Sequence, residues 1–125
     1  MRLLTVDDSA IVRKIIRAAA DVLEFELSEA ENGKEALEYM EETKEEIDLI
    51  LLDWNMPVMD GYQFLLELKS RDKYKRIPVM MVTTESEKEN IVKAIKAGAI
   101  HYMVKPFTME ELIKKIMECL GKGGM

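Results

Sequence analysis

The sequence predicts an α/β domain of the flavodoxin-like (βα)5 type, a five-stranded parallel sheet in the order 2-1-3-4-5 with helices on both faces. Two observations predict this fold. Short apolar runs alternate strictly with amphipathic helical patterns, five times in succession. Residues 49–52 (Leu-Ile-Leu-Leu) contain no polar break, which is typical of a strand buried on both faces of a parallel sheet. Right-handed crossovers are close to obligatory between such strands, so few other topologies remain.

Size and composition limit the classes of function. The chain has 125 residues, the size of one domain, and 48% of them are hydrophobic, which is enough for a core. The net charge of −6 argues against a nucleic-acid-binding face, because phosphate contacts need clustered Lys and Arg. No apolar run is long enough to span a membrane, no signal-peptide pattern precedes the first strand, and the single cysteine, Cys119, allows no internal disulfide. We therefore expect a cytoplasmic protein that binds neither nucleic acid nor a membrane.

Five strands and five helices are expected, each bounded by a local signal. The predicted strands are residues 2–6, 25–30, 49–53, 77–82 and 100–104. The predicted helices are residues 9–23, 34–43, 61–70, 86–97 and, counting the cap and stop residues, 108–121.

Capping and turn signals precede the first two helices. Asp8 or Ser9 can cap the first helix, and the Asn32-Gly33 pair is a turn signal directly before the second. Two adjacent apolar stripes run along the first helix, while its basic residues face elsewhere. The stripes are Ile11, Ile15, Ala18 and Val22, and beside them Val12, Ile16, Ala19 and Leu23.

The last three helices are bounded in a similar way. Pro57 and Gly61 keep the segment after the third strand irregular until a helix can begin. Gly98 closes the fourth helix in the usual stop position. Thr108 opens a capping box (Thr-Met-Glu-Glu) for the last helix, and Gly121 ends it. The residues predicted to face inward on the fourth helix are Ile91, Val92 and Ile95.

Polar residues follow four of the predicted strands at their carboxyl ends. They are Asp7 and Asp8, then Asp53 and Asn55, then Thr83 and Thr84, and finally Lys105. In the 2-1-3-4-5 order the first and third strands are neighbours at the switch point, where open α/β sheets bind ligands. Three carboxylates are therefore expected to meet in one cleft, beside a hydroxyl and an ammonium group.

This combination of groups favours phosphoryl chemistry. Carboxylates in contact repel one another, so one takes a proton or a cation joins them. All-oxygen ligands favour a hard ion, and Mg²⁺ typically uses one or two protein carboxylates and leaves positions for phosphate oxygens. A carboxylate such as Asp53 can act as a nucleophile and form an aspartyl phosphate, with Lys105 and Thr83 stabilising the phosphoryl oxygens. The sequence contains no Gly-rich phosphate loop, so the phosphoryl donor is expected to come from another molecule.

Taken together, these motifs resemble those of a known family, the response-regulator receiver domains of two-component signalling. The resemblance covers essentially the whole chain. It rests on Val6-Asp7-Asp8, residues 52–61 (LDWNMPVMDG), Val82-Thr83, Ala97-Gly98-Ala99 and residues 104–107 (VKPF). Within the family the chain is most similar to the single-domain chemotaxis regulators, through residues 53–57 (DWNMP), 79–85 (VMMVTTE) and 105–108 (KPFT).

The resemblance implies a phosphorylation site with Mg²⁺ as cofactor. Asp53 would accept a phosphoryl group from a histidine kinase. Asp8, Asp53 and the backbone carbonyl of Asn55 would bind the metal directly, and Asp7 would act mainly through a bound water. Lys105 would contact the phosphoryl group, and the Lys105–Pro106 bond is expected to be cis.

The resemblance also implies a switch and a surface that responds to it. Thr83 would move toward the phosphoryl group and Tyr102 would rotate inward behind it. The fourth helix, fifth strand and fifth helix would then bind a downstream protein such as a flagellar motor switch, and a phosphatase is a further implied partner. The protein would catalyse only its own phosphorylation and dephosphorylation. The receiver domain would span residues 1–121, followed by a flexible tail at residues 122–125. The residues expected on the binding surface are Lys88, Ile91, Tyr102 and Lys115.

Three other interpretations compete with this one. The residues do not separate a motility switch from a phosphorelay intermediate that passes its phosphoryl group to a histidine phosphotransfer domain. A phosphatase acting on small molecules would need an Asp-x-Asp loop, which the segment after the third strand lacks. A flavodoxin would place its flavin phosphate where Asp7 and Asp8 stand. Thr84 departs from the family pattern, because many chemotaxis regulators have Ala there.

Overall fold

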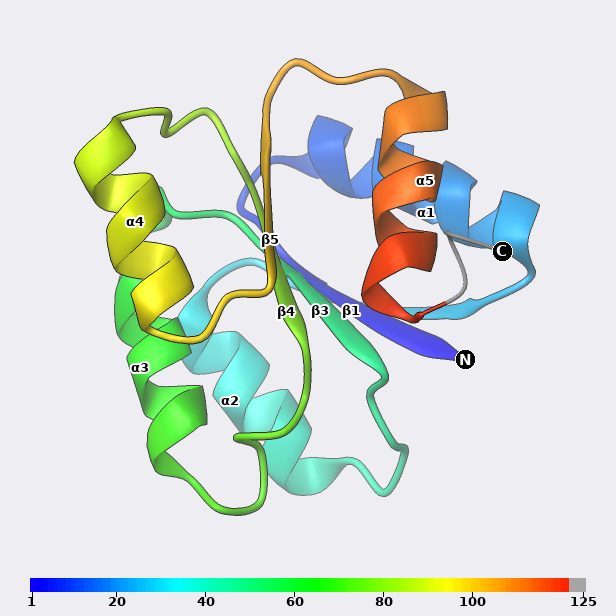
Figure 1. Ribbon diagram of the computed structural model, residues 1–125. Helices are drawn as coiled ribbons and strands as arrows, with labels where there is room; N and C mark the ends of the chain where they lie inside the picture. Colours follow the sequence, from blue (N-terminus) through cyan, green and yellow to red (C-terminus); the bar gives the residue numbers. More distant parts are fainter. Residues whose placement is uncertain (122–125) are drawn as a thin grey trace.

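The computed structural model describes residues 1–121 of the chain. The tail predicted at residues 122–125 lies outside the described residues. Within residues 1–121 a single parallel sheet carries helices on both of its faces (Figure 1). No helix in this range is long and apolar enough to cross a membrane.

The sheet has the order β2-β1-β3-β4-β5 with every neighbouring pair parallel, which confirms the predicted flavodoxin-like fold. Val6, the last residue of β1, pairs with Leu52, the last residue of β3. The residues that follow them, Asp7 and Asp53, therefore leave the sheet side by side. The strands are β1 (Arg2–Val6), β2 (Glu26–Ala30), β3 (Leu49–Leu52), β4 (Val79–Thr83) and β5 (His101–Val104).

The helices form two layers. Helices α1 and α5 cover one face of the sheet, and α2, α3 and α4 cover the other (Figure 1). Side chains along each strand point alternately to the two faces, so Leu3 joins the core under α1 and α5 while Leu4 joins the core under α2 and α3. The helices are α1 (Ala10–Leu23), α2 (Gly33–Glu42), α3 (Gly61–Ser70), α4 (Lys88–Lys96) and α5 (Met109–Cys119).

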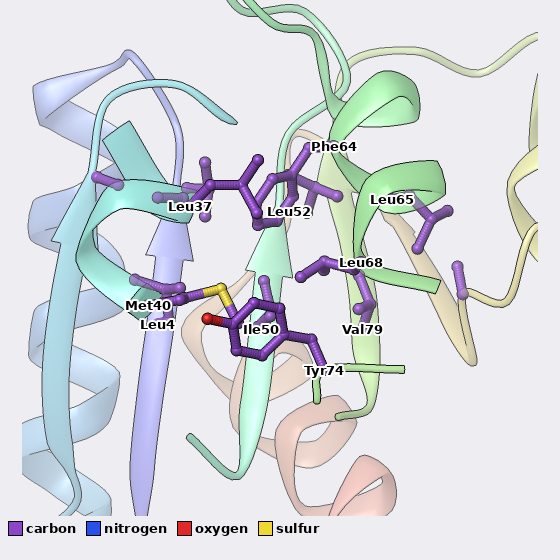
Figure 2. Close-up of a cluster of buried hydrophobic side chains, with 14 of the residues drawn as sticks. Leu4, Leu37, Met40, Ile50, Leu52, Phe64, Leu65, Leu68, Tyr74 and Val79 are labelled. Carbon is purple, nitrogen blue, oxygen red and sulfur yellow. The ribbon is translucent and has the colours of Figure 1, made fainter. Parts of the chain in front are cut away.

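Figure 2 shows the core beneath α2 and α3. Phe64, Leu65 and Leu68 of α3 are completely buried there, in one cluster with Ile50 and Leu52 of β3. Full burial of such a side chain stabilises the fold by about 1.5–3 kcal/mol. The strand that precedes Asp53 is thus clamped between two cores, which holds the carboxyl end of β3 in place.

One of the two apolar stripes predicted on α1 is buried and the other is not. Ile16 and Ala19 pack in the core. Ile11 and Val22 from the neighbouring stripe remain 74% and 67% exposed. A helix lying on a sheet buries only part of its circumference, so two adjacent stripes cannot both face the strands.

The prediction for α4 was wrong for two of its three inward-facing residues and for its start; the third, Ile91, is half-buried. Val92 and Ile95 are 42% and 45% exposed, and Ala94 is the one buried residue of the helix. The helix begins at Lys88 and not at residue 86, after an N-cap, Glu87, that makes no side-chain hydrogen bond. Because no side chain caps an earlier start of the helix, residues 86 and 87 stay in a loop.

Small shifts also occur at the strands. β4 begins at Val79 rather than residue 77, because Pro78 has no N–H to donate; its carbonyl instead accepts a hydrogen bond from Ile50 N at 3.0 Å. β4 extends to Thr83, one residue further than predicted. Thr83 is thereby held rigidly in the sheet, which decides where its hydroxyl can lie.

Candidate functional site

The central strands place two acids at the carboxyl edge of the sheet. Asp53 N donates a hydrogen bond to Val6 O at 3.0 Å, and Asp7 N donates to Ala30 O at 3.0 Å. The parallel ladders therefore continue through both acids, whose backbones are held as firmly as those of the strands. Both residues are buried: Asp7 is 2% exposed and Asp53 is 6% exposed.

Asp8 completes an acidic cluster. Carboxylate oxygens of Asp7, Asp8 and Asp53 all lie within 4.8 Å of one another. Asp8 is exposed whereas the other two are buried, so the cluster opens to solvent on the side of Asp8. The sequence predicted this convergence from the strand order alone.

Lys105 supplies the positive charge of the site. Its ammonium nitrogen lies 2.9 Å from Asp7 Oδ2 and 3.7 Å from Asp53 Oδ2. Lys105 N donates to Thr83 O at 2.9 Å, which extends the β4–β5 pairing to this residue. The Lys105–Pro106 bond is cis, as the resemblance implies.

Asp53 is held in an environment with opposing influences. Burial raises the pKa of its carboxyl and the Asp7 charge raises it further, while the Thr83 hydroxyl, the Lys105 ammonium and the Asn55 backbone lower it; the net pKa is raised. Asp53 Oδ1 is buried and has no hydrogen-bond partner among the described residues. A buried carboxylate oxygen without a partner, beside two other carboxylates, fits the oxygen ligand set that Mg²⁺ prefers.

Comparisons with known proteins agree with this geometry. The family model for the response regulator receiver domain matches residues 3–117. A chemotaxis protein CheY homolog from Campylobacter jejuni is 40% identical over 124 residues, covering 98% of this chain and 95% of that protein. The chain belongs to the response regulator receiver family.

Solved receiver structures share the fold closely. Chemotaxis response regulator CheY4 of Vibrio cholerae aligns with a TM-score of 0.86 and 34% identity, covering 95% of this chain and 98% of that one. The receiver domain of the sensor histidine kinase PA1611 from Pseudomonas aeruginosa aligns with a TM-score of 0.84 and 26% identity, covering 96% and 97%. That receiver has a magnesium ion coordinated in its active-site cleft. The CheY-like receivers are signalling switches of two-component systems and are not metabolic enzymes.

The two residues predicted to switch in this receiver meet at one peptide segment. The Thr83 hydroxyl accepts a hydrogen bond from Glu85 N at 3.2 Å, and the Tyr102 hydroxyl donates to Glu85 O at 2.7 Å. Burial, followed by the charges of Glu85 and Asp53, raises the pKa of Tyr102 to about 12, so the phenol remains a donor at neutral pH. The predicted movements of Thr83 and Tyr102 stay predictions.

Some contacts of the receiver site were not visible in the sequence. Arg13 was expected to face away, yet its guanidinium donates to Asp7 O at 2.7 Å and pairs with Glu29 and Glu31 at 3.3 and 3.6 Å. Ser9 N donates to Asp7 Oδ1 at 2.9 Å. No motif marks Arg13, because its role depends on the length of its side chain and on β2 lying beside α1.

The residues predicted on the binding surface are distributed as follows. Lys88 is exposed at the start of α4, and Ile91, Tyr102 and Lys115 are half-buried. Lys115 lies 3.7 Å from Glu118 within α5. Val104 and Ile95, on β5 and α4, are 39% and 45% exposed, although the sequence did not place either of them on the binding surface.

Proposed function

We propose that this receiver is a chemotaxis response regulator that accepts a phosphoryl group on Asp53 from a histidine kinase, with Mg²⁺ bound by the acidic cluster. The observation that carries this proposal is the arrangement around Asp53: a carboxylate with one partnerless buried oxygen, close to two further carboxylates and one ammonium group. We further propose that the protein acts in the cytoplasm, because motility signalling of this class takes place there.

Each residue has a proposed task in the transfer. An ionised oxygen of Asp53 forms a bond to phosphorus as the P–N bond of a phosphohistidine breaks, and the histidine takes up a proton. Asp8, Asp53 and the Asn55 carbonyl would hold the metal directly and Asp7 through water, and the metal would neutralise charge on the phosphoryl oxygens. The ammonium nitrogen of Lys105 lies 3.7 Å from Asp53 Oδ2. It is therefore close enough to bind an oxygen of a phosphoryl group attached to Asp53.

The proposed response is a change at α4, β5 and α5. Because Thr83 and Tyr102 bond to opposite sides of the Glu85 peptide segment, a movement of Thr83 toward the phosphoryl group alters the segment that also holds Tyr102. We propose that this exposes a different surface to a downstream protein, such as a flagellar motor switch. Lys88, Ile91, Tyr102 and Lys115 are its proposed contacts, and a phosphatase would end the signal.

The first experiment is an intact-mass measurement after incubation with acetyl phosphate, with and without Mg²⁺. One added phosphoryl group that requires Mg²⁺ and is absent from Asp53→Asn is the expected result. Asp60→Asn is the matched control: it removes an acid seven residues away, while an asparagine can still cap α3. Undiminished labelling of Asp53→Asn would overturn the assignment of the site.

A second experiment separates the motility switch from the phosphorelay intermediate. The labelled protein is mixed with a flagellar motor switch protein and, separately, with a histidine phosphotransfer domain. Binding to the motor protein that depends on phosphorylation supports the proposal. Rapid transfer of the phosphoryl group to the histidine domain, without motor binding, would contradict it and favour the relay.

A further inference from the structure

An aromatic and cationic stack joins the loop after Asp53 to α4. Trp54 stacks on Tyr62 of α3, with ring centroids 5.4 Å apart and planes inclined by 12°. The ammonium nitrogen of Lys93 in α4 lies 4.4 Å from the centroid of the Tyr62 ring. Stacked rings attract each other, and a cation over a ring face adds to this attraction. Three separate elements therefore meet through three side chains.

At the loop end of this stack, the backbone after Asp53 packs closely against α3. Gly61 N donates to Trp54 O at 2.8 Å, and a Cβ placed on Gly61 would lie 2.1 Å from Asp53 O. The first turn of α3 is thus pressed against the backbone of Asp53 and Trp54. A displacement of that backbone is therefore expected to move the first turn of α3, which carries Tyr62.

The α4 end of the stack belongs to a weakly held helix. Ala94 is its one buried residue, and its N-cap residue Glu87 makes no side-chain hydrogen bond. Because α4 buries so little surface, even a contact of modest strength contributes substantially to its position. Lys93 lies in the last turn of α4, at the opposite end from Glu85, where Thr83 and Tyr102 act.

We propose that Trp54, Tyr62 and Lys93 link the backbone at Asp53 to the C-terminal end of α4, with Tyr62 and Lys93 as positioning residues for that helix. This inference rests on the proposed function, because it gives phosphorylation of Asp53 a second route to α4. The Glu85 segment acts on the start of the helix and the stack acts on its end. Together they control the orientation of α4 and not only its first turn.

The first test measures hydrogen–deuterium exchange of the α4 amides in the unphosphorylated protein. Lys93→Met keeps the aliphatic stem and removes the charge, and Tyr62→Leu removes the ring. Both are expected to speed α4 exchange about 2- to 5-fold, the effect of losing an exposed cation–π contact. Tyr62→Phe retains the ring face and is expected to restore the original rates. Lys96→Met is the control, because it removes the same charge from the same turn of the helix without touching the stack.

The second test compares the same variants after phosphorylation with acetyl phosphate and Mg²⁺. Full labelling of Asp53 by mass, together with loss of most of the phosphorylation-dependent change in exchange at the end of α4, supports the link. A wild-type response of α4 in both Lys93→Met and Tyr62→Leu, with labelling intact, overturns it. If the unmodified protein is not labelled at all, the proposed function fails, while the first test still shows whether the stack holds α4.

Discussion

Helices α3 and α4 lie on the same face of the sheet and have similar lengths, yet they are held very differently (Figure 1). α3 buries Phe64, Leu65 and Leu68 and begins with a capping box formed by Asp60 and Gln63. α4 buries only Ala94 and has no side-chain cap. The helix that follows the loop after Asp53 is thus firmly anchored, whereas the helix next to the proposed binding surface has few contacts that hold it. Under the proposed function, this difference would allow one small domain to keep the site at Asp53 in place while its surface changes.

The largest expected contrast concerns large apolar side chains on the two helices, one buried and one exposed. Phe64→Ala should lower the free energy of unfolding by about 3–5 kcal/mol, because it opens a cavity among fully buried neighbours. Ile95→Ala on α4 should cost less than about 1 kcal/mol, because that side chain is 45% exposed. Urea unfolding measures both. Equal losses would mean that α4 is as well anchored as α3.

The N-cap residue of α3 should likewise contribute more to stability than the N-cap residue of α4. Asp60→Ala removes the side-chain oxygen that accepts a hydrogen bond from Gln63 N at 2.8 Å, and should cost about 1–2 kcal/mol. Glu87→Ala at the start of α4 should change stability by less than about 0.5 kcal/mol, because no cap bond is lost. Thermal unfolding of the two variants tests this, and a comparable loss in Glu87→Ala would show that the Glu87 side chain stabilises the start of α4.

Rigid burial of Asp53 should have a measurable cost. Burial raises the pKa of its carboxyl, so the charged form destabilises the metal-free fold at pH values above that raised pKa. Asp53→Asn should therefore stabilise the metal-free protein at pH 7, by about 1 kcal/mol. The gain should shrink as the pH falls through the raised pKa and vanish below the unfolded value of 3.8, where the acid is neutral in both states. Denaturant unfolding at several pH values would show this; a gain that is independent of pH would point to packing instead.

Addition of Mg²⁺ should make the unmodified protein more stable than Asp53→Asn, which reverses their order in the metal-free state. A ligand that binds only the folded state at one hundred times its dissociation constant stabilises that state by about 2.7 kcal/mol. The unmodified protein should gain more than Asp53→Asn, because it supplies one more carboxylate. Identical gains would remove Asp53 from the set of metal ligands.

The smallest expected effect is in the loop that leads into α3. Val58 has a positive φ of 68°, a conformation that disfavours a β-branched side chain by about 1–2 kcal/mol. Val58→Gly should relieve this strain but increase the entropy of the unfolded chain, for a net gain of about 0.5–1 kcal/mol. Val92→Gly on α4 is the matched control and should lose about 0.5 kcal/mol, since glycine is less favourable than valine inside a helix. A loss in both variants would show that Val58 makes contacts that outweigh its strain.

The fold and the grouping of the acids were predictable because they depend on short-range patterns. An unbroken apolar run such as Leu49–Leu52 has to be buried on both faces, and strict alternation of strands and helices leaves one common topology. Once the strand order is known, Asp7 and Asp53 have to emerge together. The strand ends therefore indicated the candidate site without any knowledge of side-chain contacts.

The remaining features depend on which surfaces meet after folding, and periodicity does not carry that information. Ile11 and Ile16 belong to equally apolar stripes of α1, yet the angle at which the helix lies on the sheet buries only Ile16. Tyr62 and Lys93 are 31 positions apart and no motif connects them; they meet because α3 and α4 pack on the same face. A sequence pattern records which residues prefer to be buried, whereas the balance among competing contacts in the folded chain selects the partner of each one.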